Sequence, residues 1–267
     1  MKKLLKTSAL ALTLACSFNA LADTVYWNEP EAISRLSTAE YKADFPLLSV
    51  YYQPQENKMF CGVASAAIVL NALRVESKSS EIPLDSTKFA THERGYLPHN
   101  GGKAEHSNKT FKVWSPLFHR YTQNTVLVNS PKPRIEMLGK PKEGSDFKDY
   151  GLQLDQFTQL IESNGAKITS HELSNIDDIG AIKADMIKAL KTPNQYLVVN
   201  YSRVGMQQNG GGHYAPVAAY DAETDSLLIL DPNNADYLWH WADADMMIKA
   251  MHTVDVNNYR GYSVISD

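Results

Sequence analysis

Cysteine is scarce in this chain, with only Cys16 and Cys61 among 267 residues. Cys16 lies in an N-terminal segment that we expect to be removed, so the mature protein would keep Cys61 alone. One cysteine cannot form a disulfide within its own chain, and outside the cytoplasm it is open to oxidation. The ordinary explanation is an inert cysteine that packs as a small hydrophobe. The residues around Cys61 favour a different one.

Long apolar runs and basic runs are missing as well. After residue 22 no segment is apolar over the roughly 20 residues that a membrane-spanning helix needs, so we expect no membrane partner for the mature protein. The formal net charge is −4, and it falls to −7 when the segment with Lys2, Lys3 and Lys6 is removed. An acidic chain without a basic run is not expected to bind nucleic acid.

The first 22 residues have the pattern of a secretory signal peptide. The three lysines precede an apolar run from Ala9 to about Phe18, and Ala20-Leu21-Ala22 forms a small-x-small cleavage site. The run is too short for a membrane anchor. Lipidation at Cys16 is a second alternative, but the branched apolar residue usual three places upstream is absent. We therefore predict cleavage after Ala22 and a periplasmic or secreted protein.

The mature chain, residues 23–267, has 245 residues. That length suits one catalytic domain with an ample core, divided into lobes at about 23–150 and 151–267. Residues 82–150 are the least readable part. Glycine and proline punctuate two stretches there, 99–109 and 129–146, that we expect to be loops.

Helical patterns dominate the first part of the chain. The residues from 61 to about 74 are apolar on nearly all sides, which predicts a buried helix. Residues 152–167 are amphipathic and end at Asn164-Gly165, and a further helix is predicted over about 178–191. The apolar face of the amphipathic helix consists of Leu154, Phe157, Leu160 and Ile161.

Strand patterns dominate the end of the chain, at 196–202, 213–221 and 226–232. Helices early and strands late predict an α+β fold. We expect two lobes, a helical N-terminal lobe that carries the buried helix and a C-terminal antiparallel sheet lobe.

Cys61 stands at or near the first residue of the predicted buried helix. There the positive end of the helix dipole would lower the pKa of the thiol and favour the nucleophilic thiolate. Gly62 follows and would leave room for a substrate beside the sulfur. Gln55, six residues upstream, could donate its amide to a developing oxyanion, together with the Cys61 backbone N–H. Taken singly, each of these features is weak.

A cysteine nucleophile needs a base, and His213 has the most suggestive setting. It follows Gly210-Gly211-Gly212 and opens an apolar strand, so a substrate or a second lobe can approach closely. A core histidine beside a flexible loop is the alternative. Four other histidines in the polar middle section lack metal-ligand spacing, so no metal site is predicted. They are His92, His99, His106 and His119.

Asp231 ends the next predicted strand and is the candidate for orienting His213. If the two strands form a hairpin centred near Glu223, residue 213 lies opposite about residue 233, and Asp231 is its diagonal neighbour on the same face. A slip of one residue would place the two side chains on opposite faces. An aspartate before Pro232 is also a common turn feature, so Asp231 alone says little.

Together, Gln55, Cys61, His213 and Asp231 follow the order of papain-like enzymes. A closer resemblance lies in QENKMFCGVASAAIVLNAL, which resembles the phytochelatin synthase signature, where a glutamine precedes Cys-Gly by six residues. It continues through LQLDQFTQLIESNGAK and GGGHYAPVAAYDAETDSLLILD to Tyr237 and His240-Trp241. The resemblance covers about residues 55–75 and 150–241. The chain looks like the short bacterial branch, which lacks the cysteine-rich C-terminal region of the plant enzymes.

The resemblance implies a papain-like two-lobed fold and a reaction. Cys61 would attack the Cys–Gly amide of glutathione, release glycine and hold a γ-Glu-Cys thioester. Gln55 would be the oxyanion donor, His213 the general base and acid, and Asp231 its orienter. Water would then give γ-Glu-Cys, which we expect to be the main product, and a second glutathione would give a phytochelatin. The residues expected at the substrate are Gly62, Gly212, Asn234 and Tyr237.

The resemblance also bears on cofactors and partners. Hydrolysis would require no cofactor, whereas cadmium or zinc would promote transpeptidation as metal thiolates of the substrate. Glutathione would be the small-molecule partner, and members of the family imply a small homodimer.

One departure from the family bears on the substrate. Members usually carry an arginine three residues after the aspartate, where this chain has Asn234 in Pro232-Asn233-Asn234. An arginine there would suit a substrate carboxylate, so its absence affects the expected substrate more than the mechanism. Two alternatives follow. One is a papain-like cysteine peptidase or amidase acting on another exported peptide, and the other is a catalytically silent binding protein with this fold.

Overall fold

A computed structural model describes residues 24–75, 85, 87 and 120–267. The predicted signal peptide, the loop predicted at 99–109 and the four histidines of the middle section lie outside the described residues, so these stay predictions.

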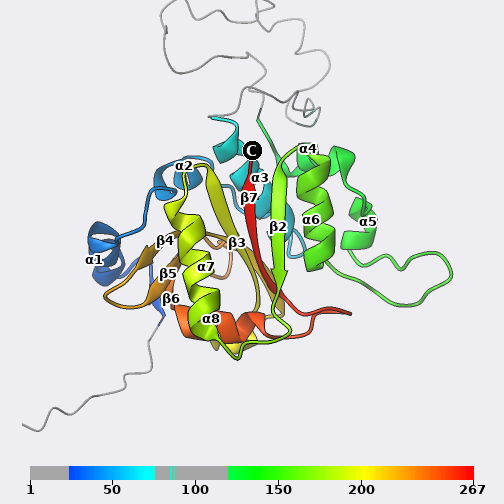
Figure 1. Ribbon diagram of the computed structural model, residues 1–267. Coiled ribbons are helices and arrows are strands. Elements are labelled where there is room, and N and C mark those ends of the chain that lie inside the picture. The colour runs from blue at the N-terminus through cyan, green and yellow to red at the C-terminus, as the bar shows by residue number, and fades with distance from the viewer. Residues whose placement is uncertain (1–23, 76–84, 86, 88–119) are drawn as a thin grey trace, which may run out of the picture.

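The described part of the chain is built on one sheet of seven strands in the order β1-β6-β5-β4-β3-β7-β2 (Figure 1). Every neighbouring pair of strands is antiparallel. The strands are β1 (Val25–Tyr26), β2 (Lys167–Glu172), β3 (Gln195–Ser202), β4 (Gly212–Asp221), β5 (Ser226–Ile229), β6 (His240–Asp243) and β7 (Gly261–Ser266). The three predicted strands correspond to β3, β4 and β5, although β5 ends at Ile229, two residues before Asp231.

Helices lie along both faces of this sheet, so the α+β prediction is confirmed. In Figure 1, α7 crosses the near face of the sheet and α3 lies behind β7 and β3. The α-helices are α1 (Pro30–Thr38), α2 (Phe45–Val50), α3 (Cys61–Leu73), α4 (Gln123–Val126), α5 (Arg134–Met137), α6 (Leu154–Ser163), α7 (Ile179–Lys191) and α8 (Ala244–Met251). Short 3-10 turns follow α4 at Leu127–Asn129 and β3 at Val204–Met206.

Each face of the sheet carries its own core. On one face α3 and α6 pack against β3, β4 and β5 through residues such as Phe157, Tyr214 and Leu228. On the other face α7 and α8 pack against the same strands through residues such as Met247 and Val217. Because the central strands β3 and β4 are covered on both sides, nearly all of their residues are buried and most of these are apolar.

The helix that begins at Cys61 is buried along its whole length. All thirteen residues of α3 are buried, and most are small or β-branched, which lets the helix approach the sheet closely. The prediction of a buried helix from residue 61 is therefore confirmed. The predicted apolar face of α6 is buried as well, and Gly165 ends that helix with a φ of 86°, a conformation that favours glycine.

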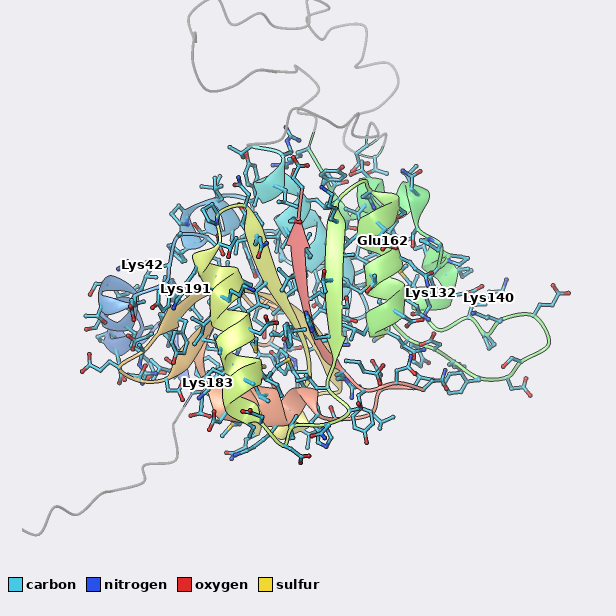
Figure 2. All side chains as sticks on the ribbon, viewed as in Figure 1. Lys42, Lys132, Lys140, Glu162, Lys183 and Lys191 are labelled. Carbon is cyan, nitrogen blue, oxygen red and sulfur yellow. The ribbon has the colours of Figure 1, made fainter. Side chains whose placement is uncertain are left out.

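The segment predicted as a loop at 129–146 contains the one-turn helix α5. A buried lysine near its start, Lys132, connects the segment to the residues before and within α6. Lys132 is buried and donates to the Asp149 backbone oxygen at 3.0 Å and to Gln156 Oε1 at 3.0 Å, and it pairs with the Asp149 carboxylate at 2.7 Å. In Figure 2, Lys132 lies next to α6, whereas Lys140 lies on the loop that projects away from it. The pairing brings the end of this loop back to the start of α6, beside α3.

Among the residues that the structure describes, no helix combines the length and the apolarity needed to cross a bilayer.

Asp44 offers a test of how burial acts in this fold. It stands at the N-cap of α2, its side chain makes no capping hydrogen bond, and one carboxylate oxygen is buried without a partner among the residues that the structure describes. Burial raises the pKa of Asp44 to about 7. A raised carboxyl pKa means that the folded state holds a proton that the unfolded state has lost, so this group reduces stability as pH rises from about 4 to about 7.

We therefore expect Asp44→Asn to raise the free energy of unfolding by about 1–3 kcal/mol at pH 8 and to change it little at pH 4. Urea unfolding at both pH values measures this. Asp178→Asn is the matched control, because the Asp178 side chain caps α7 from an exposed position and asparagine caps equally well. A gain of the same size at both pH values would contradict the assignment to the Asp44 charge.

Candidate active site

Cys61 is the first residue of α3 and lies against β4. The residue is 9% exposed. A side chain on the next residue would be crowded, because a Cβ on Gly62 would lie 3.1 Å from Leu152 Cδ1 and 3.3 Å from Tyr214 Cδ2. In the structure the missing side chain of Gly62 therefore lets the helix start pack closely on β4. Its predicted role at the substrate stays a prediction.

His213 lies beside Cys61, on β4, directly opposite Tyr201 of β3. Its Nε2 lies 2.8 Å from Asp231 Oδ1, and its side chain is hydrogen-bonded to the Cys61 sulfur. Because Nε2 is taken by the carboxylate, Nδ1 is the ring nitrogen that faces the sulfur. The structure thus brings three of the predicted residues, Cys61, His213 and Asp231, into one hydrogen-bonded chain, with His213 and Asp231 4% and 0% exposed.

A β-bulge decides that His213 and Asp231 share a face of the sheet. Near the turn Ala219 pairs with Leu228, but beyond Ala218 the register shifts and Val217 pairs with Ile229. Continued without this shift, the first register would place residue 213 opposite residue 234, with Asp231 on the other face. After the shift it lies opposite residue 233, so Asp231 is on its own face. The predicted pairing is confirmed, and one extra residue causes it.

Burial and charge act against each other on all three groups. Burial alone would raise the pKa of the Cys61 thiol, but the hydrogen bond and charge of His213, with the backbone N–H groups of Tyr214 and Gly62, lower it below its ordinary value. Burial would lower the pKa of His213, but the Asp231 charge raises it. Burial would raise the pKa of Asp231, but His213 and Arg203 hold it well below its usual range. The arrangement favours a thiolate–imidazolium pair.

Arg203 is a residue of this site that the sequence did not single out. It follows β3, is 3% exposed and donates to both carboxylate oxygens of Asp231. The motif around it, NYSRVGMQQNGGGH, holds no pattern typical of a catalytic residue. The one available signal was its place in the fold. Arg203 is a cation just after the apolar strand that pairs with the strand of His213, where it would be buried.

Gln55 is held next to the Asp231 segment by backbone contacts. Its N–H donates to the Pro232 carbonyl at 2.8 Å, and the Tyr52 hydroxyl donates to the Asp231 carbonyl at 2.8 Å. The Gln55 side-chain amide donates to the Asn57 carbonyl at 2.9 Å, which uses one of its two N–H bonds. Gln123 of α4 clamps the residues on either side, donating to the Pro54 carbonyl and accepting from the Glu56 N–H. Gln55 is thus fixed beside the segment that follows Asp231, and its oxyanion role stays a prediction.

The remaining predicted substrate residues differ in their surroundings. Gly212 precedes His213 and is exposed, and Asn234 lies exposed in the turn after Asp231. The Tyr237 ring covers the Arg203 guanidinium at 4.0 Å, and its hydroxyl donates to the Asn209 carbonyl at 2.8 Å. Tyr237 therefore closes the site around Arg203, whereas the structure gives Asn234 no comparable role.

Arg260 is the second residue that the sequence did not indicate. A Cβ on Gly212 would lie 2.8 Å from its Nη2, so the guanidinium packs flat against the glycine that precedes His213. It donates to the Val254 carbonyl at 2.8 Å and to Asp255 Oδ1 at 2.9 Å, while its buried Nε has no partner among the described residues. This places a cation beside the catalytic candidates, although the arginine expected at residue 234 is absent.

Chemically, this arrangement can carry out acyl transfer. A thiolate at the start of a helix meets an imidazolium that can return its proton to a leaving group. The first N–H groups of the helix have no partners within it and can stabilise an oxyanion.

Comparison with known proteins gives one family. The family model described as "Phytochelatin synthase" matches residues 21–88 and 107–262. A curated protein of Lotus japonicus, "Glutathione gamma-glutamylcysteinyltransferase 3", is 25% identical over 236 residues, which are 88% of this chain and 40% of that protein. "Glutathione gamma-glutamylcysteinyltransferase 2" of Arabidopsis thaliana is 26% identical over 226 residues, 83% of this chain and 39% of that protein. The chain thus spans about two fifths of the length of these relatives.

Among solved structures, xylellain, a cysteine protease from Xylella fastidiosa, aligns over 92% of this chain and 92% of its own. The sequence identity is 14% and the TM-score is 0.36. A likeness at this TM-score says nothing about the activity of this chain.

The pH dependence of Cys61 alkylation tests the site without any substrate. We expect iodoacetamide to alkylate the protein that begins at Asp23 with a midpoint below the ordinary thiol pKa of about 8.5, because His213 stabilises the thiolate. In His213→Ala only the backbone N–H groups of Tyr214 and Gly62 still oppose burial, so the midpoint should move upward and the rate at pH 7 should fall by about tenfold or more.

His252→Ala is the matched control, since the His252 ring stacks on Tyr259 and its Nδ1 donates to the Leu173 carbonyl, and neither contact involves the Cys61–His213–Asp231 group. Coincident pH profiles for the wild type and His213→Ala would show that His213 does not control the thiol.

Proposed function

The chain belongs to the phytochelatin synthase family, and we propose that it cleaves the Cys–Gly amide of glutathione through a γ-Glu-Cys thioester on Cys61. The observation that carries the proposal is the hydrogen-bonded chain from Cys61 through His213 to Asp231 at the buried start of α3. The names of the curated relatives, which are glutathione γ-glutamylcysteinyltransferases, support the substrate.

The proposed first half-reaction is acyl transfer to the cysteine. The Cys61 thiolate attacks the carbonyl carbon of the Cys–Gly amide, and the oxyanion is met by the Cys61 backbone N–H and the second amide hydrogen of Gln55. The C–N bond then breaks, and His213 gives its proton to the departing glycine amine. Asp231 keeps the imidazole oriented through Nε2 during both steps.

The proposed second half-reaction releases the dipeptide. Neutral His213 takes a proton from water as the water oxygen attacks the thioester, and γ-Glu-Cys leaves as the sulfur regains its negative charge. A second glutathione amine can replace the water and give a phytochelatin. We propose water as the main acceptor, with cadmium or zinc favouring the second route as thiolates of the glutathione substrate.

Arg260 is the proposed partner of a substrate carboxylate. Glutathione carries two carboxylates, and guanidinium groups bind carboxylates through paired, charge-assisted hydrogen bonds. The Arg260 guanidinium lies against Gly212, one residue from His213, and its Nε has no hydrogen-bond partner in the part of the chain that the structure describes. We propose that it fills the role that an arginine at residue 234 would have, with Gly62, Gly212, Asn234 and Tyr237 around the same substrate.

We propose that the protein acts outside the cytoplasm as a single catalytic domain of residues 23–267. The N-terminal lysines, the apolar run and Ala20-Leu21-Ala22 support cleavage after Ala22 and a periplasmic or secreted location. A homodimer is proposed from the family resemblance.

A peptidase that acts on another exported peptide is the second candidate. The sequence Asp231-Pro232 and the exposed Asn234 in place of arginine favour it. The catalytic steps would be the same, and only the acyl donor would differ.

Mass spectrometry of glutathione incubated with the mature protein separates the two candidates. We expect equal amounts of γ-Glu-Cys and glycine, and Cys61→Ser, which lacks the thiolate nucleophile, should reduce their formation by at least about a thousandfold. Asp231→Asn should lower it by about a hundredfold or more, because His213 loses its fixed orientation. Incubation with cadmium should add longer γ-Glu-Cys polymers.

Lys183→Met is the control for this experiment. Lys183 lies on α7, and its ion pairs with Asp225 and Asp245 do not involve Cys61. Unchanged glutathione beside a Cys61 that still reacts with iodoacetamide would support the peptidase, and γ-Glu-Cys formation by Cys61→Ser would contradict both candidates.

A further inference from the structure

Arg203 is enclosed by the loop that leads to His213. The residue follows β3 directly, and its backbone N–H donates to the Gly211 carbonyl at 2.9 Å, while its carbonyl accepts from the Gln208 N–H at 2.8 Å. A Cβ on Gly210 would lie 2.9 Å from Arg203 Cδ, and Gly210 has a φ of 124°. The loop therefore needs glycine there to close over the arginine stem.

The Arg203 guanidinium has three partners in this enclosure. Nη2 lies 3.0 Å from Asp231 Oδ1 and 2.8 Å from Oδ2. Nη1 donates to Gln208 Oε1 at 2.7 Å, and the Tyr237 ring covers the guanidinium face. Gln208 is fixed in turn, because its Nε2 lies 3.2 Å from Nε2 of the buried His240. The guanidinium cannot turn without breaking this set.

The Asp231 carboxylate takes its orientation from these contacts. Oδ1 accepts from the Asn233 N–H at 2.8 Å and meets both His213 and Arg203, while Oδ2 meets Arg203. The planar guanidinium is held at Nη1 by Gln208, so Nη2, which meets both carboxylate oxygens, has a fixed position. Arg203 thus fixes the direction in which Oδ1 of Asp231 points toward Nε2 of His213.

We propose that Arg203 is a positioning residue that holds the Asp231 carboxylate and, through it, keeps the His213 ring turned toward the Cys61 sulfur. The proposal rests on the proposed roles of Cys61, His213 and Asp231. Arg203 acts through Asp231 alone. Replacing Arg203 should therefore slow the reaction of Cys61 only when the Asp231 carboxylate is present.

The buried charges give a second reason for an arginine at this place. Without Arg203, Asp231 would carry an uncompensated negative charge at 0% exposure whenever His213 is neutral. With Arg203 the group of four side chains has no net charge both as thiol and imidazole and as thiolate and imidazolium. The proton can therefore move between Cys61 and His213 without leaving a buried net charge.

A double-mutant cycle on the rate of Cys61 alkylation at pH 6.5 tests the proposal. We expect Arg203→Met to lower this rate about tenfold and Asp231→Asn to lower it by a similar factor. The double variant should lie within about twofold of Asp231→Asn alone, because the arginine then has no carboxylate to hold. Arg203→Lys keeps the charge but loses the planar guanidinium, so it should recover only part of the rate.

Two features keep the test decisive. If Arg203→Met does not fold because Asp231 is left buried and unpaired, the cycle of Arg203→Lys, Asp231→Asn and their double variant replaces it. Arg35→Met is the control, since Arg35 donates to Ser226 on the same sheet but has no contact with Asp231. Additive losses, or a wild-type pH profile in Arg203→Met, would overturn the proposal. The assay contains no glutathione, so the coupling can hold even if glutathione proves not to be the substrate.

Discussion

One extra residue in β4, Ala218, determines whether this molecule can pair His213 with Asp231. The bulge at Ala218 changes the register of the β4–β5 hairpin by one residue and turns Asp231 to the face of His213. The other contacts of the site depend on this register. The segment from Tyr52 to Gln55 docks on the carbonyls of Asp231 and Pro232, and Cys61 follows it at the start of α3. A different register would break all of these contacts at once.

The site also depends on burying charges as a set. Burial opposes the charged form of Cys61, His213 and Asp231, and the neighbours of each group shift its pKa toward the charged form. Burial would keep any one of these groups neutral if it stood alone. Because electrostatic attraction is stronger away from water, the same burial strengthens the interactions among Cys61, His213, Asp231 and Arg203. Tyr237 and Gln208 then complete the enclosure of the arginine.

The parts of the molecule that were predictable from sequence are those with strong local patterns. The apolar run from Cys61 predicted a buried helix, the spacing of Leu154, Phe157, Leu160 and Ile161 predicted α6, and the apolar strands predicted β3, β4 and β5. β1 has two residues and β2 is polar, so neither carries a strand pattern. Arg203 and Arg260 acquire their positions only through the tertiary fold, which is why the sequence did not indicate them. The bulge at Ala218 left no signal either, since alanine is ordinary in a strand.

The central claim is that Cys61 forms a thioester with the γ-Glu-Cys part of glutathione. The most direct measurement is the intact mass of the mature protein after a brief incubation with glutathione and an acid quench. The account predicts an added mass equal to γ-Glu-Cys less one water, located on the peptide that contains Cys61 and removed by hydroxylamine. An added mass equal to glutathione less two hydrogens, released by a reducing agent, would show only a mixed disulfide. That result, with no thioester at any time point, would contradict the account.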